Sequence, residues 1–130
     1  MTKKLFILLL VCVFIMTPIS IVKADGLTPP KPLYPPDCGA VANTPYRSGT
    51  YVIGSGGLNC AQSQARIDIN VEVATNNGGH TYSAKTCYNT RWCTTNVYAY
   101  YAPGLTWTTK TSGYAQGWSW YTQSPGQYIP

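Results

Sequence analysis

The segment RIDINVEV, residues 66–73, constrains the fold of this chain more than any other stretch. Aliphatic and polar side chains alternate along it, and the aliphatic positions are Ile67, Ile69, Val71 and Val73. Because successive side chains of a β-strand point to opposite faces, this period of two predicts a strand with one buried and one wet face. Further short β-favouring runs are separated by Gly, Ser, Thr and Asn, and none has helical periodicity, so we expect an all-β protein.

Two local signals predict how this strand pairs with the chain that follows it. A turn of two or four residues centred on Asn77-Gly78 would place Val73 opposite Tyr82. A hairpin closed by a disulfide across CYNTRWC, residues 87–93, would then place Tyr82 opposite Tyr98. Both tyrosines would therefore share the buried face of the first strand.

A third signal, APGL, predicts a type II turn at Pro103-Gly104 that places Tyr100 opposite Trp107 and leaves Val97 on the outer face. Together the three turns predict a four-stranded meander. Its inward face would consist of Ile67, Ile69, Val71, Val73, Tyr82, Tyr98, Tyr100 and Trp107.

An apolar sheet face needs a cover, and the strands available for a second layer are residues 49–56 and 113–122. The predicted fold is therefore a small, disulfide-stabilised antiparallel β-sandwich, with a flattened β-barrel as the alternative. We assign it to one domain, residues 38–130, which is long enough to bury its own core.

The N-terminus predicts export. Residues 1–24 combine a short basic start, an apolar run and small residues before a break, as a cleaved signal peptide does. Residues 25–37 are Pro-rich and favour an extended segment. With no second apolar segment and no C-terminal anchoring signal in the sequence, we expect a secreted, extracellular protein without a stable membrane anchor.

Four cysteines follow the signal segment, and in an exported chain they predict two disulfides with three possible pairings. The hairpin register favours Cys87 with Cys93, which leaves Cys38 with Cys60. In that register the Cys87–Cys93 bond lies on the outer face. Tyr88 and Trp92 would turn toward the core, and Asn89 to Arg91 would form the tip of the loop. A zinc site is not expected, because the cysteines lack metal-ligand spacing and the chain has a single histidine.

Charge and spacing argue against several function classes. Without the signal segment, six basic residues face four acidic ones, too small an excess to predict nucleic-acid or anionic-membrane binding. Asp68 and Glu72 would lie ~13 Å apart on one strand, beyond the separation of paired catalytic carboxylates. The histidine, His80, is expected to pack beside Tyr100. We therefore expect no catalytic residues, no metal and no cofactor.

The aromatic residues left over from the predicted core are the best candidates for a binding site. In GWSWYTQ, Trp118 and Trp120 share one face and Tyr121 lies on the other, so that one set can be presented to a ligand. The competing interpretation is that both tryptophans close the sandwich. Asn89 and Arg91, in the stapled loop, are further candidates, although a purely structural staple also accounts for them.

Two functions fit these features. The first is a secreted, non-enzymatic binding module for cell-wall or other polysaccharide that acts through exposed Tyr and Trp side chains. The second is a secreted antimicrobial protein or enzyme inhibitor that contacts an extracellular protein through the stapled loop. The sequence pattern implies no particular oligomeric state, although edge strands of a sandwich offer a surface for pairing between copies.

Overall fold

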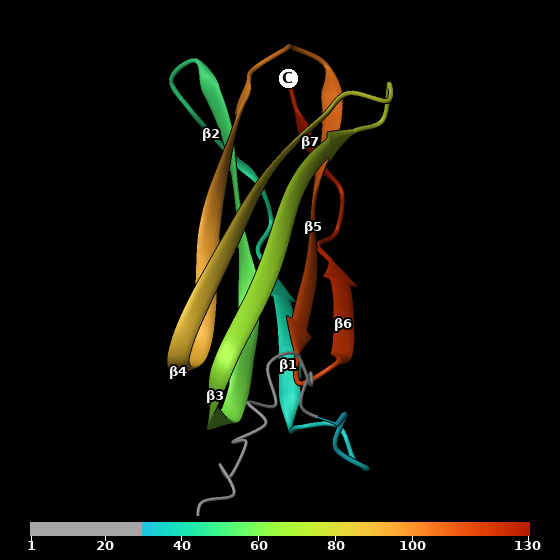
Figure 1. Ribbon diagram of the computed structural model, residues 1–130. Coiled ribbons are helices and arrows are strands. Elements are labelled where there is room, and N and C mark those ends of the chain that lie inside the picture. Colours follow the sequence, from blue (N-terminus) through green and yellow to red (C-terminus); the bar gives the residue numbers. More distant parts are fainter. Residues whose placement is uncertain (1–29) are drawn as a thin grey trace, which may run out of the picture.

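The computed structural model describes residues 30–130, which form one curled antiparallel sheet of seven strands, a half-barrel (Figure 1). The strands are β1 (Cys38–Ala42), β2 (Tyr46–Ser48), β3 (Tyr51–Thr75), β4 (His80–Tyr100), β5 (Leu105–Ala115), β6 (Trp118–Gln123) and β7 (Gln127–Ile129). Within residues 30–130 no helix has the length and apolar character needed to cross a membrane.

The long strands β3 and β4 form a ribbon that bends over on itself at one end of the molecule (Figure 1). Residues 51–59 pair with 92–100, residues 64–74 pair with 80–90, and the register shifts between Asn59 and Gln64. Each strand therefore contributes to both halves of the sheet. The first half consists of β1, β2 and the part of the ribbon before the shift in β3; the second half consists of the remaining ribbon with β5, β6 and β7.

The core lies between these two halves. Its buried apolar side chains include Val52, Leu58, Ile67, Ile69, Val71, Val73, Val97, Ala99, Trp107, Ala115 and Ile129. The halves approach closely at Gly54 and Gly56 of β3, where an added Cβ would meet side chains of the second half. Glycine there leaves room for the facing strands.

Replacing Gly54 with alanine is expected to lower the free energy of unfolding by about 1–3 kcal/mol, because the new methyl group would overlap the side chains of Val73 and Thr109. Gly39→Ala is the matched control, since no heavy atom beyond its own chain neighbours lies within 4 Å of the position of its Cβ. Urea unfolding of both variants checks this. Equal stability of the two would show that the halves are not closely packed at Gly54.

The predicted all-β, antiparallel, disulfide-stabilised fold is confirmed, although β3 and β4 run through both halves instead of building separate layers. Both predicted disulfides, Cys38–Cys60 and Cys87–Cys93, are present. The first joins directly opposed residues of β1 and β3. The buried positions predicted within RIDINVEV are confirmed, and so is the inward placement of Trp107.

The predicted register of the first hairpin is wrong by one residue. Val73 lies opposite Thr81 because the turn after Thr75 holds three residues, closed by a hydrogen bond from the Thr75 N–H to the Gly79 carbonyl. In this turn Gly78 has a positive φ of 92°, which fits the common three-residue loop. A slip of one residue exchanges the two faces of a strand. Tyr82 is consequently exposed and not part of the core.

The expected hairpin across CYNTRWC is also wrong. Cys87 and Cys93 belong to the same strand, and their disulfide spans the bend of β4. The two arms of β4 touch through side chains: the Ser83 and Thr95 hydroxyls lie 3.4 Å apart, and the Lys85 ammonium donates to the Thr94 carbonyl. Each arm forms its strand ladder with β3 instead. The predicted meander therefore does not form.

In the arm of β4 after the bend, the buried and exposed faces of the strand are exchanged relative to the prediction. Val97 and Cys93 are buried, whereas Tyr98, Tyr100 and Trp92 are exposed. The remaining aromatic residue expected on the core side, Tyr88, is exposed as well, and Cys87 packs against the core. The disulfide thus lies inward, and the aromatic side chains lie outward.

The Pro103-Gly104 turn forms, with a positive φ of 73° at Gly104, but it connects the two halves and does not close a hairpin. β5 pairs with β3, so that Trp107 lies opposite Thr75 and not opposite Tyr100. Residues 51–56 do cover the Ile67–Val73 face, as expected. Residues 113–122 instead extend that half sideways through β5 and β6.

The predicted signal peptide, residues 1–24, lies outside the described residues, as does the start of the Pro-rich segment. Residues 30–37 form no strand. Lys31 in this stretch places its ammonium 3.6 Å from the centre of the Trp118 ring, a cation–π contact that holds the segment against β6.

Candidate functional site

The outer side of the first half forms a continuous surface of uncharged residues, which we call the uncharged face. Strand pairing arranges it in five rows across β1 or β2, β3 and β4. From the open end toward the bend, the rows are Ser48, Tyr51 and Tyr100; Tyr46, Ile53 and Tyr98; Asn43, Ser55 and Asn96; Val41, Gly57 and Thr94; and Gly39, Asn59 and Trp92. None of these side chains is charged. At ~3.3 Å per residue, the rows extend over about 26 Å.

Tyrosine side chains cluster at the open end of the uncharged face. The Tyr51 ring lies 6.1 Å from Tyr98 in an edge-to-face contact and 5.2 Å from Tyr100 in a tilted one. Tyr100 is 78% exposed, and Tyr46 and Tyr98 are each more than half exposed. The side-chain interaction with Tyr100 raises the pKa of Tyr51, so this phenol is uncharged at neutral pH. The cluster is therefore a neutral aromatic platform.

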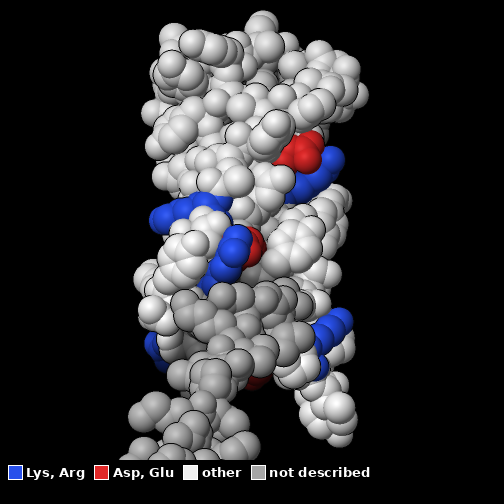
Figure 2. All heavy atoms as spheres, viewed as in Figure 1, with Lys and Arg blue, Asp and Glu red and all other residues white. Residues whose placement is uncertain are grey.

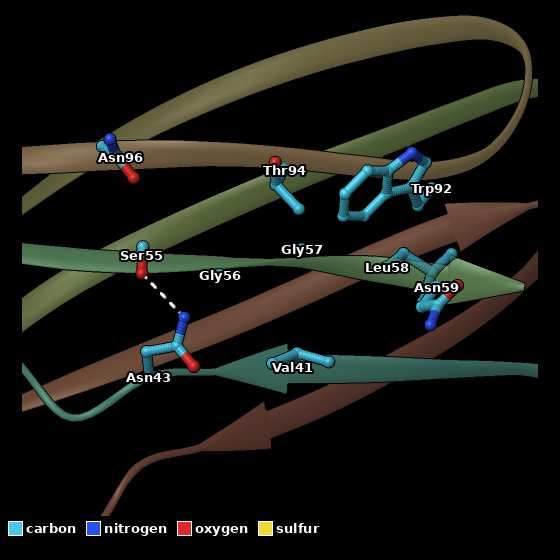
Figure 3. A pocket seen from close by; sticks show the side chains of 10 residues that line it. All are labelled: Val41, Asn43, Ser55, Gly56, Gly57, Leu58, Asn59, Trp92, Thr94 and Asn96. Atoms are coloured by element: carbon cyan, nitrogen blue, oxygen red, sulfur yellow. Dashed lines mark hydrogen bonds between the residues drawn. The ribbon is translucent and has the colours of Figure 1, made fainter.

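A hollow of about 360 Å³ lies toward the bend of the same face (Figure 3). Its floor is the bare backbone at Gly56 and Gly57, where no side chain rises between the neighbouring strands. Val41 of β1 stands on one side of this floor, and Thr94 and Trp92 of β4 stand on the other (Figure 3). Trp92 is 66% exposed and Val41 is 45% exposed, so apolar surface is presented to the hollow from both sides.

Amide side chains surround this hollow. Asn43, Asn59 and Asn96 all line it, together with Ser55. The Asn43 Nδ2 donates a 2.8 Å hydrogen bond to Ser55 Oγ, which fixes the orientation of the amide and leaves its Oδ1 as a free acceptor (Figure 3). The hollow thus combines apolar walls with hydrogen-bonding groups, of which the Asn43 amide is held in place by Ser55.

The outer side of the second half differs in charge, and we call it the charged face. Arg66 contacts Asp68 at 2.9 Å, and Lys110 lies 3.7 Å from Glu72. Basic and acidic groups also lie side by side on the surface seen in Figure 2. Exposed tyrosines occur here too, but they stand in rows with charged residues; Tyr82, for example, lies opposite Glu72. The charged face therefore suits a neutral ligand less well than the uncharged face.

Asp68 makes stability sensitive to acid. Burial favours a higher pKa for this carboxyl group, but hydrogen bonds from Thr86 (2.6 Å) and Arg66, together with the Arg66 charge, lower it overall. A lowered pKa in the folded state stabilises the protein above the unfolded pKa of ~3.9, and this stabilisation is lost as the pH falls through the folded value.

We expect Asp68→Asn to remove this contribution, so that the variant loses less stability than the wild type between about pH 5 and pH 2. The effect should be below ~1 kcal/mol, because the ion pair is largely exposed. Thermal unfolding over this pH range measures it. A variant with the same acid dependence as the wild type would contradict the assignment to Asp68.

The structure separates the aromatic site residues that the sequence analysis proposed. Trp118 and Trp120 of β6 point inward and are half-buried, whereas Tyr121 is 61% exposed on the charged face. Trp120 packs against the core, and the Trp118 ring makes a cation–π contact with the Lys31 ammonium. These contacts favour the interpretation that both tryptophans close the fold.

Asn89 and Arg91 lie at the bend of β4 and not at the tip of a hairpin. Asn89 has a positive φ of 50°, a conformation that asparagine tolerates better than most residues. Arg91 lines a polar hollow of about 430 Å³ together with Asp37 and Asn59. Neither residue shares a hollow with Trp118, Trp120 or Tyr121 among those described here. An effector function through this bend stays a prediction.

The sequence analysis missed the uncharged face because it assigned Tyr98 and Tyr100 to the core and turned Trp92 inward. One signal could have found it: in the stretch WCTTNVYAY, small residues and Val alternate with aromatic or polar ones. Cys93, Val97 and Ala99 form a face that packs easily in a thin core, and the larger rings occupy the other face.

No constellation for metal binding appears within residues 30–130, where no three His, Cys, Asp or Glu side chains gather. His80 is exposed and lines a hollow of about 320 Å³ with Tyr100 and Trp107, at the open end of the fold. Comparison with protein-family models gave no match, and comparison with curated proteins gave no significant one.

Proposed function

We propose that this protein is a secreted, non-enzymatic module that binds an uncharged polysaccharide on the uncharged face. The observation that carries the proposal is the combination of exposed Trp and Tyr rings with Asn, Ser and Thr side chains on one surface. The rows of this surface contain no charged side chain, although the Lys85 ammonium is hydrogen-bonded to the Thr94 carbonyl. The hollow in Figure 3 belongs to the same surface as the tyrosine cluster.

The chemistry of sugars supports this assignment. The C–H faces of a pyranose ring are apolar and stack on aromatic rings, while its hydroxyl groups exchange hydrogen bonds with amides and hydroxyls. Tyr and Trp also lose little side-chain entropy on binding. The length of the face, about 26 Å, allows several sugar units of one chain to be in contact at once.

The surface is held rigidly, which lowers the cost of binding. Four of the five rows stand entirely on paired strands, and Asn43 in the remaining row is held to β3 by a backbone hydrogen bond to Ser55. The Cys38–Cys60 disulfide ties β1 to β3 next to the row of Asn59. A preformed surface of this kind needs little rearrangement when a ligand arrives.

Export remains part of the proposal. Two disulfides are typical of extracellular proteins, and the predicted signal peptide would direct the chain there. Mass spectrometry of the secreted, non-reduced protein should find a mature N-terminus near Asp25. Recovery of the chain only inside cells with reduced cysteines would contradict export.

A pull-down on insoluble polysaccharides tests the function. The purified domain should be retained by at least one neutral polysaccharide, and retention should change little between 0.05 M and 0.5 M NaCl, because no ion pair contributes. No sugar should be released from the polysaccharide during the incubation. Failure to be retained on any neutral polysaccharide, or release of all bound protein by salt, would overturn the proposal.

A further inference from the structure

We infer that the hollow over Gly57 recognises the acetamido group of an N-acetylated amino sugar, so that the preferred ligand is a polysaccharide built from such sugars. This inference rests on the proposed function and names the substrate class of the same face. It depends on three features of the hollow: a gap the width of a side chain, apolar walls, and amide groups beside them.

The gap arises because the row through Val41, Gly57 and Thr94 lacks its central side chain. Val41 and Thr94 therefore face each other across two strand spacings, about 10 Å. The Thr94 methyl group lies next to Gly57, where a Cβ would collide with it and with the Cys93 carbonyl. Strand pairing itself thus keeps this position open, since any side chain there would disturb the β3–β4 ladder.

The walls of the gap are apolar in a part of the face that is otherwise polar. Val41 contributes its isopropyl group, Thr94 its methyl group and Trp92 its indole ring, and all three line the hollow. A hydroxyl group placed between them would find few partners. A methyl group would lose water and gain contacts on both sides.

The amides lie where the rest of an acetamido group needs them. The free Asn43 Oδ1 can accept a hydrogen bond from an N–H group, and Asn59 and Asn96 each carry an amide NH₂ that can donate to a carbonyl. Asn43 and Asn96 flank the gap in the row on one side, and Asn59 flanks it in the row on the other. An acetamido group offers one donor, one acceptor and one methyl group, which matches this set.

The test compares three tetrasaccharides by isothermal titration calorimetry on the purified mature domain. The first is made of N-acetylglucosamine, the second carries N-formyl groups and so lacks only the methyl, and the third is made of glucose. We expect the N-acetyl form to bind at least 10-fold more tightly than the glucose form, with the N-formyl form in between.

Val41→Thr provides the matched variant, because it replaces one methyl group of a half-exposed side chain by a hydroxyl of similar size. It should reduce the preference for N-acetyl over N-formyl several-fold, and it should weaken binding of the N-acetyl form more than binding of the glucose form. Its thermal unfolding should match that of the wild type.

The outcomes separate this inference from the proposed function. Equal affinity for the N-acetyl and glucose forms would overturn the inference and leave polysaccharide binding in place. A preference that persists unchanged in Val41→Thr would also overturn it, because the hollow would not be its source. Absence of binding to any neutral glycan, soluble or insoluble, would overturn both.

Discussion

Replacing Trp92, Tyr98 and Tyr100 together with alanine is expected to lower the affinity for a neutral polysaccharide by on the order of 100-fold or more. Each ring is more than half exposed on the uncharged face, so each can stack on a sugar. Truncation of a central aromatic anchor typically costs ~1–2 kcal/mol or more, which corresponds to roughly 5- to 30-fold for a single variant. Affinity electrophoresis in gels that contain the polysaccharide measures the loss.

The matched control is the triple variant Tyr82→Ala, Tyr114→Ala and Tyr121→Ala on the charged face. These rings are exposed to a similar extent, at 66%, 52% and 61%. The control should retain the affinity of the wild type within about twofold. If both triple variants lost binding equally, or if only the control did, the uncharged face would not be the binding surface.

Removing the Cys38–Cys60 disulfide by a double alanine substitution is expected to lower the free energy of unfolding by about 3 kcal/mol. The bond closes a loop over a sequence separation of 22 residues, and the entropy lost by the unfolded chain grows with that length. Removing Cys87–Cys93, which spans only 6 residues, should cost less, about 2 kcal/mol. Urea unfolding of the two double variants under the same conditions gives the comparison.

The two disulfide variants should also differ in binding. Cys38–Cys60 anchors β1, which carries Val41 into the hollow, whereas Cys87–Cys93 joins the two arms of β4 on the inner side. At a temperature where both variants are folded, loss of the first disulfide should weaken binding more than loss of the second. A larger loss of stability and of binding for Cys87–Cys93 would contradict this assignment of roles.

The sequence sufficed for the features that depend on local pattern and chemistry. Alternation in residues 66–73 predicted their buried face correctly, because a period of two is imposed by strand geometry alone. The even number of cysteines in the predicted mature chain predicted two disulfides. The structure contains both of the predicted pairs, Cys38–Cys60 and Cys87–Cys93. The turn at Pro103-Gly104 was also predicted, since only glycine adopts the required positive φ without strain.

Features that depend on an odd or even count of residues could not be predicted in the same way. The TNNGGH turn accommodates two, three or four residues with similar local chemistry, and the three-residue form reverses the faces of the strand that follows. Tyr82 moved from the expected core to the surface for this reason. Local propensity does not distinguish these cases, since tertiary packing selects among them.

The bend inside β3 and β4 explains why the site was missed. A short disulfide loop in a sequence suggests a hairpin. Here Cys87 and Cys93 lie in one continuous strand, and their disulfide spans the bend of that strand. The bend coincides with the register shift between Asn59 and Gln64 in the partner strand, which lies far away in the sequence. Because the bend was not predicted, the sequence indicated a surface rich in Tyr and Trp, but the prediction did not place that surface on the correct side of the sheet.

The most direct test of the proposed function is the mapping of backbone amide NMR shifts on titration with a bound neutral oligosaccharide. We predict that the largest changes occur at residues 41–43, 53–59 and 92–100, which form the uncharged face. Residues 108–112 and 119–123 of the charged face should remain unchanged. Changes concentrated in those two segments, or at the bend around Arg91 alone, would contradict the assignment of the site.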